Sequence, residues 1–436
     1  MSQHHSKHTG ISRIVASRVS GGADGLWRSP SAWIAVSGLS LSLMVMILAV
    51  AIVVGFKHDI TTKITSMDPS ITITNHFDST ISYAAEANPE AIKAKGIDSL
   101  LMTQVQQIVP PGTLVVMATH REGVLRTDSS FAGVRISGYS PQMDYRFLDG
   151  AMVSGTLPDW SDNDSRDKIV ISQYLSQSLD IDTGDRIDAF FFSNGNLRQR
   201  KLTVAGVFNT NFPDRDKLQC YGSISLLNRM AQYPVGHSQS VEVRGLSLDS
   251  VATVRSNLVS SLQQYQLQAQ MQGLEAGPWL ISDIFDSAGV WLNWLELLDT
   301  NVVVILILMG AVGAFTLLSS LFILILERIR MIGILKSLGA TNAQITRIFA
   351  LISCRIVLFG LLIGNALALS LIWLQQRYHI MALDPEAYYL DSVPARIVWW
   401  QIAAVNAGVV LLTAAIMLIP SRMIARLSPT SSMRFD

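Results

Sequence analysis

Between Asp299 and Glu327 the chain carries no charged residue, and most residues in this run are apolar. A helix needs about 20 consecutive apolar residues to cross the hydrocarbon core of a bilayer, so the run is long enough for one span. A basic and amphipathic segment, 327–349, follows it directly. A span that leads into such a segment and then into another apolar run requires the chain to cross a membrane and turn back.

Three further runs are long enough to cross a membrane, at about 31–56, 350–374 and 398–420. The composition agrees, because 49% of residues are hydrophobic, 15% are charged and the mean hydropathy is +0.34. Ordinary soluble domains have roughly 25% charged residues. The first run is too long for the apolar core of a cleavable signal peptide, so we expect an uncleaved anchor despite the Ala-x-Ala sequence at 49–51.

Lysine and arginine residues indicate the orientation of the spans. The leader 1–30, the segment 327–349 and the tail 421–436 carry most of the basic residues that flank the spans. The positive-inside rule places such segments in the cytosol. We therefore expect both termini inside, with the long segment 57–282 and the short segment 375–397 outside.

The segment 57–282 has the mixed pattern of a soluble α+β domain, inserted between the first and second of four transmembrane helices. Strands are predicted at 71–75, 113–119, 131–138 and 168–171, with a hairpin at 186–208 whose turn is 193–196. Helices are predicted at 98–108, 172–180, 224–232 and 249–270. A last helix, 283–299, is expected to run into the second span, so that 283–326 combines a stalk with transmembrane helix 2.

Motifs for catalysis or metal binding are missing from the sequence. It has no GxxxxGK[ST] phosphate loop, so it is not expected to hydrolyse ATP by that route, and it has no GxSxG frame. His120, His237 and His379 lack the spacing of metal ligands. Cys220 in the outer segment and Cys354 in a span are not expected to pair. The net charge of zero argues against a polyanionic partner such as nucleic acid.

The basic segment 327–349 predicts a helix, a turn and a second helix. Gly339 is suited to the left-handed conformation that ends a helix, and Thr341 to Gln344 have the form of a capping box that starts the next one. Ile332 and Gly333 share one side of the first helix. A tight cytosolic hairpin with positive-inside charges explains the same residues, so composition alone leaves a further role open.

Polar and small residues inside the spans predict helix packing. Gly360 and Gly364 form a GxxxG pattern, which permits close approach of two membrane helices. Asn365 and Asn406 are interior amides that can hydrogen-bond between helices.

The stretch 315–349, FTLLSSLFILILERIRMIGILKSLGATNAQITRIF, closely resembles the FtsX-like permease family, the membrane subunits of mechanotransmitting ABC systems. In that family one span, a large outer domain and three further spans follow in this order. The resemblance implies that the segment after span two is a coupling helix that docks into the ATPase subunit. Carried over onto this sequence, the coupling residues are Glu327, Arg330, Ile334, Lys336, Leu338, Gly339 and Ala340.

Three stretches resemble lipoprotein-releasing permeases of the LolC/LolE type within this family. They are the first span with its exit at Gly55 to Lys57, the outer loop 383–397 and the tail 420–436. The outer domain is similar to the periplasmic core domain of MacB-type permeases. The resemblance implies a non-catalytic subunit in the cell inner membrane that extracts lipoproteins, while a separate partner hydrolyses ATP. The alternatives are a MacB-like efflux or export permease and an FtsX-like signal transmitter without a transported substrate.

The partners implied by the resemblance are an ABC ATPase dimer, which binds the ATP and magnesium, a second permease copy and a lipoprotein. The second copy is either identical or a paralogue, and this chain itself needs no cofactor. A periplasmic lipoprotein carrier is a further candidate. Because the 186–208 hairpin is too short for the hook that recruits carriers in some of these permeases, 209–220 is the alternative contact.

A substrate cavity for acyl chains is implied between spans one and two. Met is adaptable enough to line such a cavity, although a lipid-facing or core stripe explains the same residues. The candidate lining residues are Met44, Met46, Leu48, Val304 and Leu308.

Overall fold

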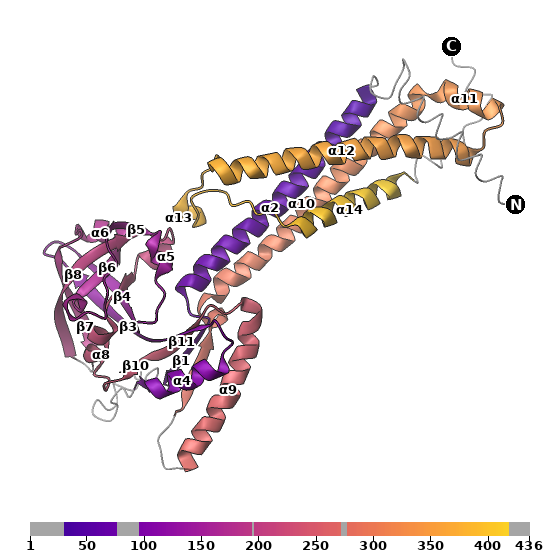
Figure 1. Ribbon diagram of the computed structural model, residues 1–436. Coiled ribbons are helices and arrows are strands. Elements are labelled where there is room, and N and C mark those ends of the chain that lie inside the picture. Colours follow the sequence, from indigo (N-terminus) through magenta and orange to yellow (C-terminus); the bar gives the residue numbers. More distant parts are fainter. Residues whose placement is uncertain (1–29, 76–95, 194–195, 272–276, 418–436) are drawn as a thin grey trace. The chain divides into compact units, whose positions relative to one another are not determined.

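The structure is a computed structural model, and it describes residues 30–75, 96–193, 196–271 and 277–417 (Figure 1). The expectations for the leader 1–30, apart from Pro30, and for the tail 421–436 therefore lie outside the described residues. So do the two middle residues of the predicted 193–196 turn. The chain forms two compact units. The helical unit contains the described parts of 1–59, 294–382 and 392–436, and the outer unit contains 60–293 with 383–391.

The described chain has four helices that are long and apolar enough to cross a membrane. They are α2 (Pro30–Met67), α10 (Ile284–Glu327), α12 (Asn342–Tyr378) and α14 (Trp399–Ile416). The helix α2 does not end with its apolar run at Phe56, because charge ends a membrane run but not a helix, and no glycine or proline interrupts 57–67. It ends two residues before Pro69, which disfavours helical backbone in the residue before it. The predicted 283–299 helix is the start of the single helix α10.

The helix α2 is the most enclosed of these four. The most apolar stretch of α2 is 44% buried within the described chain, whereas that of α10 is only 11% buried. Residues of α2 such as Leu39, Leu43 and Ile47 lie in a core that also contains Leu317 of α10 and Ala368 of α12. The most apolar stretch of α10 is therefore largely exposed within the part of the chain that the structure describes.

The predicted packing features are confirmed. A Cβ atom built on Gly364 would lie 2.9 Å from the backbone oxygen of Ser40, and one on Gly360 would lie 2.7 Å from Leu39 Cδ2. The Ser40 hydroxyl donates to the Gly360 carbonyl at 3.1 Å. Asn365 Nδ2 donates to Asn406 Oδ1 at 2.7 Å, and Asn406 Nδ2 returns a hydrogen bond to Asn365 Oδ1 at 3.0 Å. Small residues thus bring α12 against α2, and a reciprocal amide pair joins α12 to α14.

Gly364→Ala is expected to destabilise the helical unit by about 1–3 kcal/mol, the usual cost of overpacking a close contact. The added methyl group would meet the backbone oxygen of Ser40 and the side chain of Leu43, and because backbone cannot move aside, α2 and α12 must separate. Thermal unfolding of the full chain in detergent measures the effect. Gly408→Ala on α14 is the matched control, because a Cβ there meets nothing within 4 Å. Equal unfolding temperatures for Gly364→Ala and the wild type would contradict this account.

The outer unit is an α+β domain built on one strongly curved sheet. Ten described strands belong to it, in the order β12-β1-β11-β3-β4-β9-β6-β8-β5, with β7 joining β3 and β8. Their bounds are β1 (Ile71–Asn75), β3 (Leu114–Arg126), β4 (Phe131–Tyr139), β5 (Met152–Gly155), β6 (Lys168–Ser172), β7 (Arg186–Ser193), β8 (Asn196–Phe208), β9 (Gln219–Tyr221), β11 (Ser240–Arg244) and β12 (Trp279–Asp283). A separate pair joins β2 (Ile97–Asp98) to β10 (His237–Ser238).

Helices cover two regions of this sheet (Figure 1). They are α4 (Ser99–Ile108) and α9 (Leu248–Met271) near β12 and β3, and α6 (Gln173–Leu179) and α8 (Ile224–Ala231) near β4, β6 and β8. The shorter helices are α5 (Arg146–Asp149), α7 (Pro213–Asp216) and α13 (Pro385–Tyr388). The core under α6 and α8 contains Ile136, Ile169, Phe191 and Leu227, each almost completely buried. The predicted strands and helices are confirmed, although β3 extends to Arg126, beyond its predicted end at 119. The sheet strands β5, β9, β11 and β12 were not predicted.

Candidate functional site

The segment between α10 and α12 forms the predicted helix and turn. The helix α10 ends at Glu327, and α11 runs over Ile329–Ser337. Gly339 has φ +89°, so the left-handed conformation expected there is confirmed. The capping box is also confirmed, because Thr341 Oγ1 accepts from the Gln344 backbone N–H at 3.4 Å and Gln344 Oε1 accepts from the Thr341 N–H at 2.9 Å.

One side of α11 packs inside the helical unit. Ile332 is fully buried and Gly333 is buried beside it. Ile332 belongs to a core with Ala32, Ala35 and Val36 of α2, Leu324 and Ile325 of α10, and Ile345, Ile348, Phe349, Ile352 and Ile356 of α12. Because three long helices contribute to this core, a displacement of α11 acts on α2, α10 and α12 together.

The opposite side of α11 presents apolar residues to the outside. Ile334 is 56% exposed and Leu338 is 79% exposed. Arg330 is exposed as well, and the spacing of four residues places Arg330, Ile334 and Leu338 on one face. Exposed apolar side chains beside a cation on a short helix are the composition of a protein docking surface.

The structure separates the seven predicted coupling residues into three groups. Arg330, Ile334 and Leu338 share the exposed face, with the exposed Gly339 next to it. Glu327 is exposed at the end of α10 and accepts a hydrogen bond from the Ser31 hydroxyl at 3.3 Å. Lys336 is half-buried, and Ala340 packs against the inner core rather than facing outwards.

The five predicted cavity residues do not come together within one chain. Met46 is buried among α2, α10 and α14, and Met44 and Leu48 pack partly against the same core. Val304 and Leu308 lie on α10, where they are 49% and 56% exposed. Of these five residues, only Met46 lines the small gap between α2, α10 and α14. Val304 and Leu308 therefore lie on the exposed surface of α10 in the part of the chain that the structure describes.

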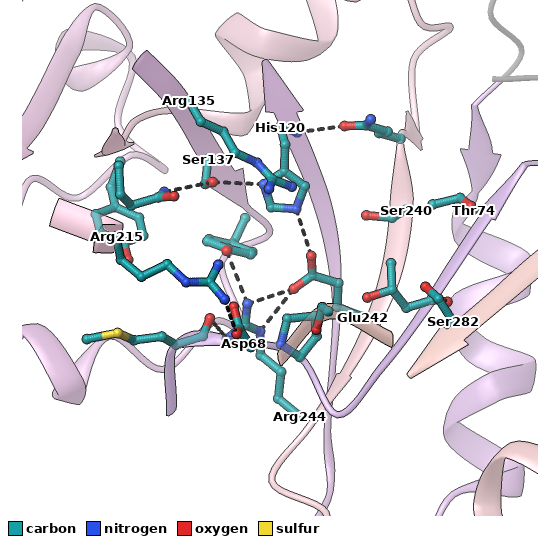
Figure 2. A pocket seen from close by; sticks show the side chains of 18 of the residues that line it. Asp68, Thr74, His120, Arg135, Ser137, Arg215, Ser240, Glu242, Arg244 and Ser282 are labelled. Atoms are coloured by element: carbon teal, nitrogen blue, oxygen red, sulfur yellow. Dashed lines mark hydrogen bonds and ion pairs between the residues drawn. The ribbon is translucent and has the colours of Figure 1, made fainter. Parts of the chain in front are cut away.

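The outer unit contains a polar cavity of about 270 Å³ (Figure 2). Strands β1, β3, β4, β9, β11 and β12 line it, together with residues of 210–216, Met67 at the end of α2 and Ser287 near the start of α10. Figure 2 shows Asp68, His120, Arg215, Glu242 and Arg244 converging on this space. The cavity therefore lies beside the last residue of α2 and the first turn of α10.

A buried charge network forms one wall of the cavity. Arg244 donates to Glu242 Oε2 from Nη2 at 2.7 Å and from Nε at 3.0 Å, and the exposed fractions of their side chains are 6% and 1%. His120 Nε2 lies 2.7 Å from Glu242 Oε1, and His120 Nδ1 lies 2.8 Å from the Ser137 hydroxyl. Burial acts to raise the pKa of Glu242, but Arg244 and His120 outweigh it and lower this pKa to about 2. Glu242 is thus held as a carboxylate.

The same network fixes the end of α2. Arg244 Nη1 donates to the backbone oxygens of Met67 at 3.0 Å and Ser66 at 3.3 Å. A cation at the C-terminus of a helix stabilises the helix dipole and satisfies carbonyls that have no partner within the helix. Beside it, Arg215 Nη2 lies 2.5 Å from Asp68 Oδ2. Burial outweighs the arginines and raises the pKa of Asp68 above its usual value.

This arrangement joins β11 to β3 and to the end of α2. The carboxylate of Glu242 is occupied by Arg244 and His120, and the described residues contain no group of three metal-ligating side chains. Sequence reasoning missed the network because its members lie between 68 and 244 with no common motif. One local signal existed: in SVEVR (240–244) the charged residues alternate with valines, which places Glu242 and Arg244 on one face of a strand.

The stretch 209–220, the predicted alternative carrier contact, is partly buried, with Asp214, Lys217 and Leu218 exposed. Thr210, Phe212, Asp216 and Cys220 are buried, with exposed fractions of 8%, 2%, 5% and 0%. Cys220 and Cys354 are both free thiols, as expected. The side chains of the first half of this stretch contact other parts of the outer unit instead.

Two family models match the chain. The MacB-like periplasmic core domain matches residues 32–260, more than half of the 436 residues, and the FtsX-like permease C-terminal domain matches 303–429. The chain belongs to the FtsX/MacB family of ABC transporter permeases. Permeases of this kind are membrane-spanning subunits, and their ATPase is a separate partner.

Curated relatives within this family are distant. The chain is 20% identical over 415 residues to the "Lipoprotein-releasing system transmembrane protein LolC" of Xylella fastidiosa (strain 9a5c), covering 92% of this chain and 93% of that protein. It is 24% identical over 281 residues to LolE of the same system from Haemophilus influenzae, covering 62% of this chain and 65% of that protein. The solved periplasmic region of MacB from Actinobacillus actinomycetemcomitans is 15% identical, with 51% and 92% coverage and a TM-score of 0.30, too low to support an argument.

Proposed function

We propose that this FtsX/MacB permease is a subunit of an ABC transporter that extracts lipoproteins from the inner membrane. The observation that carries the proposal is the exposed face of α11, where Ile334 and Leu338 stand out from a helix whose other side is packed against α2, α10 and α12. An ATPase that docks on this face would push on three long helices at once. The choice of lipoproteins rests on relatives that are named for lipoprotein release.

Two permease copies would enclose the substrate. The helix α10 supports this arrangement, because its most apolar stretch is only 11% buried within the described chain. Val304 and Leu308 lie on that exposed surface, so a second copy facing them would complete an apolar cavity. The same proposal places both termini and α11 in the cytosol and most of the outer unit in the periplasm.

A photo-crosslinker at Val304 or Leu308 is expected to capture a triacylated lipoprotein in the nucleotide-free complex. Crosslinkers at Met46 and Leu411 are the controls. Met46 is only 5% exposed within the chain, whereas Leu411 is an apolar residue of α14 that is 70% exposed and reports non-specific contact with lipid-embedded proteins. Capture should exceed that at Leu411 at least about fivefold.

Equal capture at Leu308 and Leu411 would contradict the proposed cavity. Capture of a small-molecule drug or a soluble peptide, with none of lipoprotein, would favour a MacB-like efflux or export permease instead.

A further inference from the structure

An eight-residue segment of the outer unit, the 209–216 loop, contacts three different entry segments. These entry segments are the end of α2, the start of α10 and the 383–391 loop, which joins α12 to α14. They are the three places where the chain passes between the helical unit and the outer unit. The 209–216 loop consists of Asn209 to Thr210, the turn around Asn211 and Phe212, and α7.

The contact between the 209–216 loop and the 383–391 loop is aromatic and polar. The rings of Phe212 and Tyr389 have centroids 4.8 Å apart, and Phe212 is only 2% exposed. Asn211 Nδ2 donates to Asp391 Oδ1 at 2.8 Å, and the Tyr389 hydroxyl donates to Asp214 Oδ2 at 3.3 Å. Aromatic pairs stabilise by about 0.5–1.5 kcal/mol beyond the burial of their area.

The helices α2 and α10 contact the same two loops, 209–216 and 383–391. Lys63 of α2 donates from Nζ to the backbone oxygen of Tyr389 at 2.6 Å and to that of Thr210 at 3.0 Å. Trp291 of α10 has its ring centroid 5.1 Å from that of Tyr389 and 5.5 Å from that of Phe212. Phe212, Trp291 and Tyr389 therefore form one aromatic cluster with a side chain from each of three segments.

A second link fixes the 209–216 loop to the chain just beyond α2. Arg215 pairs with Asp68, the residue that follows α2, as Figure 2 shows. The carboxylate of Asp216 in turn accepts hydrogen bonds from the backbone N–H of Thr210 at 3.0 Å and from its hydroxyl at 2.6 Å, which closes the loop on itself.

Tyr389 has a backbone conformation that is unfavourable for a residue with a side chain. Its φ is +61°, in the left-handed region that few non-glycine residues occupy. Such residues cost of order 1–3 kcal/mol and persist only where surrounding contacts determine them. The two ring contacts, the Lys63 hydrogen bond and the Asp214 hydrogen bond supply those contacts. Tyr389 is also the C-cap of α13, where a left-handed residue ends the helix, and these contacts fix its ring at that position.

The base of the 383–391 loop is tied to the end of α12. Gln375 donates to the backbone oxygens of Met381 at 3.2 Å and Val393 at 3.0 Å, and it accepts from the Met381 N–H at 3.0 Å. The Val393 N–H donates to the Met381 oxygen at 3.0 Å. A loop whose two ends are joined to the helix and to each other moves with α12 rather than absorbing its motion.

We propose that the 383–391 loop is a third mechanical connection into the outer unit, beside α2 and α10, and that Tyr389 is the residue that positions it on the 209–216 loop. This inference rests on the proposed function, in which ATP-driven displacement of α11 moves α2, α10 and α12. Motion of α12 reaches the outer unit through Tyr389 and Phe212, and it arrives at the same cluster as the motion of α2 and α10.

The test compares Tyr389→Ala with Tyr389→Phe in the full permease–ATPase complex. Spin labels on Asp162→Cys, an exposed site in the outer unit, report the distance between the two outer units with and without ATP. Tyr389→Ala is expected to keep ATP hydrolysis within about twofold of the wild type and to lose at least half of the ATP-dependent distance change. Tyr389→Phe, which loses only the hydroxyl, and Leu218→Ala, at a 55% exposed position shortly after the loop, should both retain the change.

A full distance change in Tyr389→Ala overturns the inference. A wild-type complex that hydrolyses ATP without any distance change shows that the proposed function itself is wrong. A second measurement covers the case in which Tyr389→Ala does not fold: a short bifunctional thiol reagent joins Asn211→Cys to Asp391→Cys. The joined complex should keep the full distance change because the contact moves as one body, and loss of the change would overturn the inference.

Discussion

Gly339→Val is expected to leave ATP hydrolysis by the partner intact and to reduce lipoprotein release at least about tenfold. Gly339 has φ +89°, and a Cβ built there meets nothing within 4 Å. The substitution therefore changes only the backbone preference. A left-handed conformation costs a residue with a side chain roughly 1–2 kcal/mol, more for a β-branched one, and 1.4 kcal/mol is a tenfold change in population. The end of α11 should shift and displace Leu338 from the exposed face that it shares with Arg330 and Ile334, the face on which the ATPase is proposed to dock.

Release and ATP hydrolysis in a reconstituted complex measure the effect of Gly339→Val. Gly339→Asn is the matched control, since asparagine tolerates the left-handed region, and it should behave like the wild type. Leu338→Ser tests the docking face without changing the turn, and it should weaken binding of the ATPase because Leu338 is 79% exposed. Full release by Gly339→Val and Leu338→Ser would show that this turn is only a connection between two helices.

Glu242→Gln is expected to destabilise the outer unit by about 3–5 kcal/mol, because it leaves the buried Arg244 without a compensating charge. Arg244 also donates to the last carbonyls of α2, so the loss should loosen the end of that helix. Thermal unfolding of the full chain, followed by circular dichroism, measures the change. Asp144→Asn is the matched control: its partner Arg146 is 85% exposed, and exposed pairs contribute at most about 1 kcal/mol.

The pH dependence of stability follows from the same carboxylate. The pKa of Glu242 is lowered to about 2 in the folded chain from an ordinary value of 4.5. Its contribution to stability is therefore fully present above about pH 4.5 and is lost as the pH falls towards 2. Asp68 acts with the opposite sign, because burial raises its pKa. The Glu242→Gln variant should lack the part of the acid-induced loss of stability that Glu242 causes, and an unchanged profile would contradict the assignment.

Apolar run length and local turn chemistry determined much of this protein before any tertiary contact was considered. The four long apolar helices follow from apolar runs with little or no charge. The end of α11 follows from Gly339 and the start of α12 from the Thr341 capping box, which act within a few residues. The same holds for most strands of the outer unit, since alternation is a local pattern. The close approach at Gly364 was also predictable in kind, because small residues four apart permit contact between helices.

Only the tertiary structure decided which residues meet across long separations in the chain. His120, Glu242 and Arg244 become one network because the sheet order places β11 beside β3, which no local pattern in either strand specifies. Phe212 and Tyr389 are far apart in the chain and neither has a motif, yet they form one cluster. Burial and ring contacts of this kind depend on what lies opposite a residue, and a local pattern carries no information about that.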